Sequence, residues 1–449
     1  MKNPRDQLVR LVGRGWDQVK GSLYRNAIFI MLTSVISSGL GFFFWLVVSI
    51  RYQQADIGAA ITLFSTLGFV GVLGNVGIGI GLIRYLPETE DKPALVNAGL
   101  TLSGVVTFAL SLAFLAVLPV LIPSLAFVLQ DPLYILTIVL CSVTLGLAPI
   151  LDSTSIAVRR AEMQTFRNTI FALLKIPVAF GIVVFLSGRA GVFLSLALSY
   201  GVSVAVLGFI LIPRAMPRYR PRLDFRFDRV RPILRFSLGN YAATVISSAG
   251  VLLPTALIYD TLGPNDGPSN AAYFYIALIV ASLLYIIPGA AFTSFYAEAS
   301  HENVDRRRGE RQAILLSVSL LIPGIAVLWI FSDPMLRLFG GGNPGYADNA
   351  VTPLRIMMFA SIPVFLNGIL GTRVRVRKRT LPLILSATIV SSITLGLGWF
   401  LLQNPDLGID GLAYAYVLGQ VAATPYLYFE ARQAYEAVPS EPFLGQPLE

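Results

Sequence analysis

LVNAGLTLSGVVTFALSLAFLAVLPVLI, residues 95–122, is a run of the sequence that contains no charged side chain. An α-helix rises about 1.5 Å per residue, so about 20 apolar residues cross the roughly 30 Å of hydrocarbon in a bilayer. The run is long enough to span a membrane as one helix. It decides the fold because blocks of the same kind recur along the whole 449-residue chain.

The composition agrees with a membrane protein. Hydrophobic residues make up 55% of the chain and charged residues 13%, and the mean hydropathy is +0.70. A soluble domain carries about a quarter charged residues. The sequence therefore predicts an all-α integral membrane protein with about twelve transmembrane helices, at residues 26–50, 57–83, 95–122, 133–157, 169–187, 190–213, 233–258, 271–296, 312–331, 351–370, 381–402 and 411–430.

The basic residues predict the orientation. Of the 34 lysines and arginines, 29 fall in the N-terminal segment and in every second connection after it. The intervening connections contain only Arg51, Arg189 and Arg337. Because cytoplasmic connections are enriched in lysine and arginine, both termini are expected in the cytoplasm. The first apolar block has no small-residue cleavage site, so we expect a multi-pass protein of the inner (plasma) membrane rather than a cleaved signal peptide.

The chain divides into two similar halves. A basic linker at 214–232 separates six spans at 26–213 from six spans at 233–430, and the tail 431–449 follows. Val35-Ile36-Ser37-Ser38 in the first span is echoed by Val245-Ile246-Ser247-Ser248 in the seventh. Each half begins on the same side, which is typical of parallel repeats related by an axis along the membrane normal. We expect two six-helix lobes around a central cleft.

Two segments outside the spans are basic. In residues 1–25, an apolar stripe with the basic residues beside it predicts a cytoplasmic amphipathic helix on the membrane surface; a plain charged tail is the alternative. The stripe consists of Val9, Val12, Trp16, Val19 and Leu23. The linker 214–232 and the net charge of +9 raise the question of nucleic acid. The position of the linker between two spans instead favours contact with anionic membrane lipid, so no nucleic-acid partner is expected.

Few charges fall inside the spans. Asp152 and Lys175 are predicted at similar depths in the fourth and fifth spans, and a charge in a span costs about 3 kcal/mol. Three interpretations stay open: a structural Asp152–Lys175 ion pair, a role in coupling to protons or substrate, or a lysine that extends to the interface.

Arg84 is the first candidate for substrate binding. It closes the second span after Gly74, Gly77, Gly79 and Gly81. These glycines weaken the helix, so we expect it to bend or to let a ligand approach the backbone. An arginine fork binds phosphate in a bidentate manner. The alternative is a border residue paired with Glu88.

Other candidates are weaker. Arg25 and Arg235 begin the first and seventh spans at equivalent positions and either guard the inner mouth of the cleft or are ordinary flanking charges. Asn75, Asn240 and Asn367 are polar residues within or beside spans, and we expect them to face the cleft.

Several kinds of chemistry are not expected. The chain has one cysteine, Cys141, and one histidine, His301, which leaves no disulfide framework and no metal site of those ligands. Gly340-Gly341-Gly342 lacks the Lys-Ser/Thr that completes a phosphate-binding loop. Apart from the N-terminal segment, no predicted connection exceeds about twenty residues, too short for an ATPase or catalytic domain. The sequence thus predicts neither an enzyme nor a cofactor.

Three short stretches resemble a known family. Gly-Ile-Gly-Leu-Ile-Arg-Tyr-Leu-Pro-Glu at 79–88, DSTSIAVRRA at 152–161, and Leu338-Phe339-Gly340 followed by Gly345-Tyr346-Ala347 are similar to segments of the Wzx-type oligosaccharide flippases. The resemblance implies the fold of the multidrug/oligosaccharidyl-lipid/polysaccharide exporters, which is MATE-like. It also implies a polyprenyl-(pyro)phosphate-linked oligosaccharide as substrate, moved from the inner to the outer leaflet by alternating access. Cationic groups, here Arg84, Arg25 and Arg235, would then hold the phosphates, and polysaccharide-assembly proteins are possible partners.

The sequence leaves other functions open. A cation-coupled multidrug exporter of the same fold is expected to carry acidic residues within its lobes, yet spans one, two, seven and eight contain no carboxylate before Asp260 at the outer edge. A membrane enzyme of glycan assembly would need longer outer connections. A scaffold or a non-directional scramblase is the remaining alternative.

Overall fold

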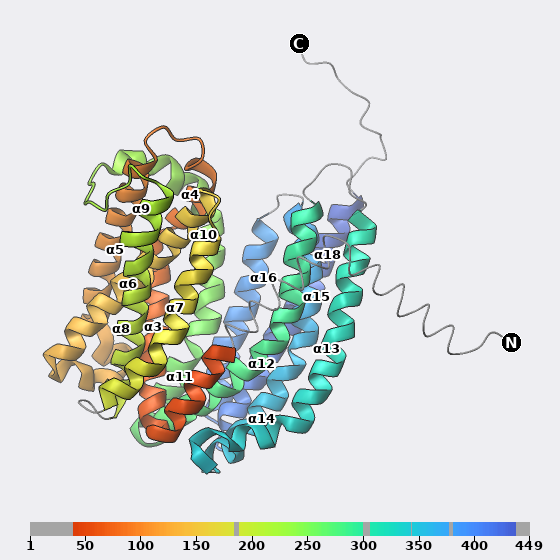
Figure 1. Ribbon diagram of the computed structural model, residues 1–449. Helices are drawn as coiled ribbons and strands as arrows, with labels where there is room; N and C mark the ends of the chain where they lie inside the picture. Colours follow the sequence, from red (N-terminus) through yellow and green to blue (C-terminus); the bar gives the residue numbers. More distant parts are fainter. Residues whose placement is uncertain (1–38, 184–187, 300–305, 343, 377–379, 437–449) are drawn as a thin grey trace, which may run out of the picture.

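The computed structural model describes residues 39–183, 188–299, 306–342, 344–376 and 380–436. In these ranges all regular structure is helical, and no strand is present. The predicted amphipathic segment 1–25, Arg25 and the tail beyond 436 lie outside the described residues. Figure 1 shows the helices as two groups that converge at the end of the molecule marked by α11 and α14.

The helices of the first half of the chain form one of these two groups. Its long helices begin where an aspartate can cap them: Asp91 accepts a hydrogen bond from the backbone N–H of Ala94, and Asp131 accepts one from Leu133. A short helix, Gly39–Arg51, precedes them. The group comprises α3 Gln54–Asn75, α4 Ile78–Tyr85, α5 Lys92–Leu121, η1 Pro123–Gln130, α6 Pro132–Ala157, α7 Glu162–Val183, α8 Arg189–Val206, η2 Leu207–Leu211 and α9 Ile212–Ala215.

The second half begins after the linker, which contains the short helix η3 Phe227–Arg229. Several of its helices carry an internal proline, and Pro254 follows the 43° bend between α10 and α11. The elements are α10 Arg231–Leu252, α11 Pro254–Thr261, α12 Gly263–Ala299, α13 Arg306–Arg337, η4 Phe339–Gly342, α14 Gly345–Phe359, α15 Ser361–Val376, α16 Leu381–Ser392, η5 Ile393–Leu397, α17 Gly398–Leu402 and α18 Gly408–Glu436.

The helices agree with the predicted spans. In the described residues, nine helices are long and apolar enough to cross a membrane, and the bent pair α10–α11 makes ten if it counts as one span. Predicted spans two to twelve each coincide with one to three consecutive helical elements. The prediction of an all-α multi-pass membrane protein is confirmed. Its division at 214–232 stays a proposal.

The second predicted span is broken in the middle. Val76 and Gly77 both adopt left-handed backbone angles, with φ of 51° and 77°, and separate α3 from α4. Two side chains satisfy the groups freed by the break: the Asn75 side-chain oxygen accepts a 3.4 Å hydrogen bond from the Gly79 N–H, and the Tyr241 hydroxyl donates to the Leu73 carbonyl at 2.7 Å. The expected bend in the glycine-rich segment is confirmed.

The glycines after the break serve helix packing rather than ligand approach. A Cβ atom at Gly77 would lie 2.9 Å from the Cβ of Tyr241 on α10, and one at Gly81 would overlap the Ile233 side chain. A Cβ at Gly79 would lie 2.9 Å from the Ser153 hydroxyl oxygen on α6. The glycines therefore allow α4 to wedge between α6 and α10.

Candidate functional site

The main cavity has a volume of about 960 Å³ and lies among helices of the second half. Its walls come from α10, α12, α15, α16 and α18, and Ile80 of α4 is the contribution of the first half. The volume is at the upper end of the range of ordinary ligand pockets. Most polar side chains on its wall are neutral: Asn240, Thr244, Ser247, Ser248, Tyr285, Asn367, Thr372, Thr380, Ser386, Ser391, Tyr416 and Gln420.

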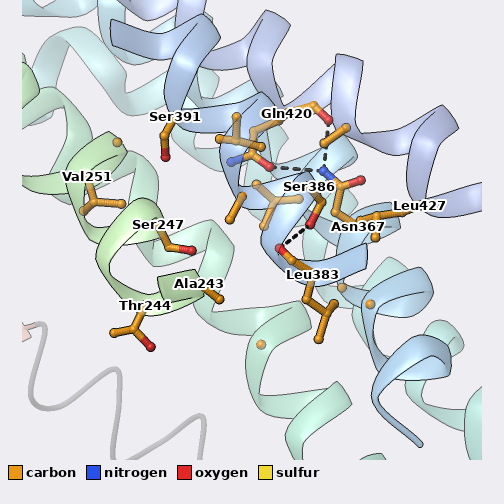
Figure 2. A pocket seen from close by; sticks show the side chains of 18 of the residues that line it. Ala243, Thr244, Ser247, Val251, Asn367, Leu383, Ser386, Ser391, Gln420 and Leu427 are labelled. Atoms are coloured by element: carbon orange, nitrogen blue, oxygen red, sulfur yellow. Dashed lines mark hydrogen bonds between the residues drawn. The ribbon is translucent and has the colours of Figure 1, made fainter. Parts of the chain in front are cut away.

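One wall carries a connected amide network. The Asn367 amide nitrogen donates to the Gln420 backbone carbonyl at 2.9 Å and to its side-chain oxygen at 3.1 Å. The Thr424 hydroxyl donates to the Asn367 side-chain oxygen at 2.9 Å. Figure 2 shows this α15–α18 junction facing the cavity. The network fixes the amides, which leaves their remaining hydrogen-bonding positions preorganised for a polar ligand.

The face of α15 continues this wall toward its C-terminal end. Asn367, Gly371 and Arg375 follow one another at intervals of four residues and all line the cavity. Gly368 also lies on the wall, where a Cβ would meet the Phe292 ring at 3.1 Å. Eight residues of helix place Arg375 about 12 Å from Asn367 along the axis. The cavity thus has a neutral part at Asn367 and a cationic part at Arg375.

The opposite wall is the hydroxyl-rich face of α10. Thr244 and Ser247 lie across the cavity from Asn367 and Gln420 (Figure 2). Where α10 meets α16, the Ser391 hydroxyl donates to the Ile246 carbonyl at 2.7 Å. Immediately after this contact α16 continues into the single π-helical turn η5, a feature that is frequent at functional sites.

The charge on the cavity wall is positive. Arg375 is the one cation among the lining residues, and these described residues include no aspartate or glutamate. Its neighbour Arg373 is paired with Glu310 at 2.7 Å, whereas no ion pair of Arg375 is found in the described part of the chain. Arg375 is therefore placed to bind an anion.

Arg84 lies just beyond the same cavity. It is one helical turn after Ile80 and on the same face of α4. The guanidinium stacks on the Phe236 ring of α10, 4.8 Å from its centroid. Among the described residues it forms no ion pair with Glu88, so the paired border role is not seen. The stacked guanidinium keeps its N–H donors at its edges, where they can bind an anion.

The structure separates the other predicted site residues. Asn240 and Asn367 line the cavity. Asn75 is buried at the α3–α4 break and caps α4; its amide nitrogen has no hydrogen-bond partner. Arg235 is exposed and absent from the cavity wall, because five residues of helix turn it about 140° away from Asn240. The predicted role of Arg235 at the mouth therefore finds no support in its position.

Of the three interpretations of Asp152 and Lys175, the structural ion pair between them is wrong. Asp152 instead forms a buried bidentate pair with Arg167, with N–O distances of 2.9 and 2.7 Å. Helix α7 begins at Glu162, seven residues before the predicted start of the fifth span, and Arg167 lies in its first part. Lys175 follows Arg167 by eight residues, so it lies about 12 Å deeper along the helix. The Lys175 ammonium is buried between the rings of Phe44 and Phe171, at 4.7 and 5.1 Å.

Opposite the arginine end, the two halves are in close contact. Gly58 near the start of α3 packs on the backbone carbonyl of Pro268 near the start of α12. The Ser49 hydroxyl accepts a 2.9 Å hydrogen bond from the Gly340 N–H, and the Trp45 and Tyr275 rings pack edge to face. These contacts join the halves at the end where Figure 1 shows α11 and α14.

Most of the cavity wall is not apparent from the sequence. Tyr285, Tyr416 and Gln420 lie in apolar spans, where a single polar side chain gives no indication of the direction it faces. One signal was available: the repeated Val-Ile-Ser-Ser motif includes Ser247 and Ser248, which both line the cavity. In the described residues, no group of three or more His, Cys, Asp or Glu side chains could hold a metal ion.

Comparisons with known proteins agree with this fold. The chain superposes on an inward-facing multidrug resistance MATE family transporter of the MOP superfamily with a TM-score of 0.66 and 12% identity, covering 92% of this chain and 100% of that one. It superposes on the inward closed conformation of the lipid II flippase MurJ with a TM-score of 0.69 and 15% identity, covering 90% and 87%. The all-helical fold is therefore MATE-like, as predicted. The predicted cleft between two six-helix lobes stays a prediction, because the cavity found here lies among helices of the second half.

Sequence comparison gives the family. Residues 53–343 match the model of the family described as polysaccharide biosynthesis protein, and the chain belongs to this family. It is 25% identical over 334 residues to the succinoglycan biosynthesis transport protein ExoT of Rhizobium meliloti (strain 1021), an alignment that covers 72% of this chain. The chain spans 63% of the length of that relative. The resemblance to polysaccharide flippases is confirmed at the level of the family.

Proposed function

We propose that this protein moves a lipid-linked oligosaccharide from the inner to the outer leaflet of the plasma membrane, with both termini in the cytoplasm. The family is one of polysaccharide biosynthesis, and the similar ExoT is named a transport protein. The single observation that carries the proposal is the cavity: a large space within helices of apolar spans whose polar wall is neutral except for one arginine. We propose no catalytic role for it.

The neutral part of the cavity suits a glycan. Sugar hydroxyls cannot enter hydrocarbon without compensating hydrogen bonds, because each unpaired group costs several kcal/mol. The Asn367–Gln420 network and the α10 hydroxyls of Thr244 and Ser247 supply donors and acceptors on opposite walls. They would replace water around the glycan during its passage.

The basic end suits the phosphates of the lipid carrier. Arg375 on the wall and Arg84 one turn beyond Ile80 are exposed cations at this end of the cavity. An arginine fork matches phosphate geometry. We therefore assign the (pyro)phosphate to the Arg375–Arg84 end and the glycan to the Asn367 end. A role for Arg25 in the same task stays a prediction.

The transport direction follows from electrostatics. An inside-negative potential favours outward movement of an anion by about 2.3 kcal/mol per charge per 100 mV. Alternating access then requires the halves to separate at the Gly58–Pro268 end and to close around the arginines. No nucleotide hydrolysis is needed in this scheme.

The composition of the cavity weighs against a cation-coupled multidrug exporter. A site for protons, sodium ions or cationic drugs is expected to include a carboxylate. None is found among the residues that line the cavity, and its charged member, Arg375, would repel a cation.

Reconstitution tests the proposal directly. The purified protein is placed in vesicles containing a fluorescent polyprenyl-pyrophosphate-linked oligosaccharide, and flipping is scored by the access of a glycosidase to the outer face. We expect Arg84→Gln and Arg375→Gln each to slow flipping about tenfold or more, because a hydrogen bond to a charged group contributes about 1.5–3 kcal/mol.

Arg235→Gln is the matched control, because this exposed arginine lies on the far side of α10. This variant should move the labelled carrier at the wild-type rate. The proposal fails if wild-type vesicles flip no labelled carrier under an applied potential. The phosphate assignment fails if the control loses activity while Arg375→Gln retains it.

A further inference from the structure

The linker between α9 and α10 follows a defined path along α5. The Asn97 amide nitrogen donates to the Arg220 carbonyl at 3.0 Å, and the Asp224 N–H donates to the Thr101 hydroxyl at 2.9 Å. The linker then returns, and the Arg229 guanidinium pairs with Asp91 at 3.0 Å. It therefore runs from Asn97 to Thr101 and back to the start of α5, with Asp224 at the turning point.

This turning point reaches the hydrocarbon boundary. Thr101 is ten residues beyond Asp91, which is about 15 Å along the helix. Helix α5 has 30 residues and so is about 45 Å long, about 15 Å more than the hydrocarbon core. Even if the whole excess length lay on the linker side, Thr101 would lie within about 2 Å of the hydrocarbon boundary. One turn further along α5, Val105 is an exposed apolar side chain.

The side chains at the turning point are apolar and unburied. Leu223 is 75% exposed and Phe225 is 62% exposed on either side of the buried Asp224. Arg226 pairs with Asp224 at 2.6 Å, and this contact lowers the pKa of the carboxyl well below its usual range, so the pair stays ionised. Leu223 and Phe225 thus project outward from a fixed backbone at the depth where lipid begins.

Arginines flank these apolar side chains. Arg218, Arg220 and Arg222 are exposed, and no ion pair of theirs is found in the described residues. Arginine near an anionic bilayer surface contributes about 1 kcal/mol of attraction, which is about a fivefold change in partitioning. Nucleic acid would not match the apolar pair, because it cannot follow Leu223 and Phe225 to the hydrocarbon boundary.

We propose that residues 218–226 form a membrane-inserted strap that binds the anionic phospholipid headgroups of the adjacent leaflet. Leu223 and Phe225 enter the acyl-chain boundary, and Arg218, Arg220 and Arg222 contact the headgroup phosphates. The strap leads through the short helix η3 to α10, whose Ile233 packs against Gly81 of α4. It thereby anchors the inner end of α10 to the bilayer. This inference does not depend on the transported substrate.

Electron paramagnetic resonance of the full-length protein tests the strap. Cys141 is the single cysteine and is buried, so a nitroxide can be attached selectively to Phe225→Cys, with Leu223→Cys as a second reporter. The exposed Glu88→Cys, in the connection between α4 and α5, is the matched control. The protein is reconstituted in phosphatidylcholine vesicles with and without phosphatidylglycerol, and relaxation by oxygen is compared with relaxation by a water-soluble nickel chelate.

We expect the reporters in phosphatidylglycerol vesicles to be relaxed by oxygen and protected from nickel, the reverse of the control. The triple variant Arg218→Gln/Arg220→Gln/Arg222→Gln should lose this protection from nickel. Inorganic phosphate added to the variant should not restore the protection, because the strap binds phosphates that are held in a bilayer. Nickel access equal to that of the control at both reporters would overturn insertion. Equal protection in both lipid mixtures, or displacement of the strap by added duplex DNA, would overturn the recognition of anionic lipid.

Discussion

Asp152 shows how a residue inside a membrane finds its partner. It lies five residues before the end of α6, and Arg167 lies five residues after the start of α7, so the two face each other across a helical hairpin. Both are buried, and the Arg167 guanidinium also lies over the Tyr200 ring at 5.4 Å. Lys175, further along α7, places its ammonium beside the rings of Phe44 and Phe171 instead of Asp152. The buried ion pair therefore belongs to the structure of the first half.

Asp152→Asn should destabilise the protein by about 3–5 kcal/mol, because it leaves the Arg167 guanidinium buried without a counter-charge. Asp152→Asn/Arg167→Met should recover most of this loss, whereas Asp152→Asn/Lys175→Met should recover none. Thermal unfolding in detergent measures the differences. Asp91→Asn, which removes the exposed partner of Arg229, should cost at most about 1 kcal/mol. Rescue by Lys175→Met would contradict the pairing seen here.

At the scale of the element, span two is two helices rather than one. The left-handed residues Val76 and Gly77 interrupt it, and Asn75 and Tyr241 compensate the lost hydrogen bonds. The interruption redirects α4, and the glycines on α4 bring it close to α10, where Arg84 stacks on Phe236. The break thus places Arg84 beside the second half of the chain.

Gly81→Ala should destabilise the α4–α10 contact by about 1–3 kcal/mol, because the new methyl group would overlap Ile233 in a packed interface. Adding Ile233→Ala should relieve the overlap. Gly239→Ala on α10 is the control, since a Cβ there meets no atom within 4 Å, and it should be neutral or stabilising by up to about 1 kcal/mol. Thermal unfolding again provides the measurement. An unchanged melting temperature for Gly81→Ala would show that α4 and α10 are not closely packed.

The whole molecule is closed at one end and hollow within its second half. Gly58 and Pro268, Ser49 and Gly340, and Trp45 with Tyr275 hold the halves together opposite the arginines. The cavity reaches from the Ser391 contact with Ile246 to Arg375. Under the proposed function, this arrangement is one state of an alternating-access cycle, in which a change at Gly58 alters the balance between states.

Gly58→Val should keep the two halves apart at the end where they are now in contact, because the valine side chain would overlap the Pro268 carbonyl. We expect a Thr244→Cys reporter on the cavity wall to react faster with an impermeant maleimide added on the side opposite the linker. Gly68→Ala, whose Cβ makes an ordinary 3.7 Å contact with Leu252, should leave the rate unchanged. Equal labelling rates in the two variants would mean that the Gly58 contact does not control access.

The sequence by itself determined the membrane class, the positions of the spans and the family. Length and hydropathy suffice for the class and the spans, because a span such as 95–122 must satisfy its own backbone hydrogen bonds as a helix wherever it packs. The family followed from three short stretches that resemble its members. The glycine-rich segment 74–81 also indicated the bend, since its weakness is local. The repeated Val-Ile-Ser-Ser motif predicted two similar halves, and the structure adds that Ser247 and Ser248 of its second copy line the cavity.

Only the tertiary structure decided which side chains meet. Asn367 hydrogen-bonds to Gln420, 53 residues further along the chain, and the linker hydrogen-bonds to Thr101, more than a hundred residues before it. No local sequence pattern encodes these contacts. Arg235 and Arg375 are both arginines at span ends, and only helix rotation directs Arg375 to the cavity wall. The sequence left Lys175 open as one partner of Asp152, whereas the fold pairs Asp152 with Arg167 near the start of α7. In a helix bundle, depth and rotation depend on packing against neighbours, and hydropathy specifies neither.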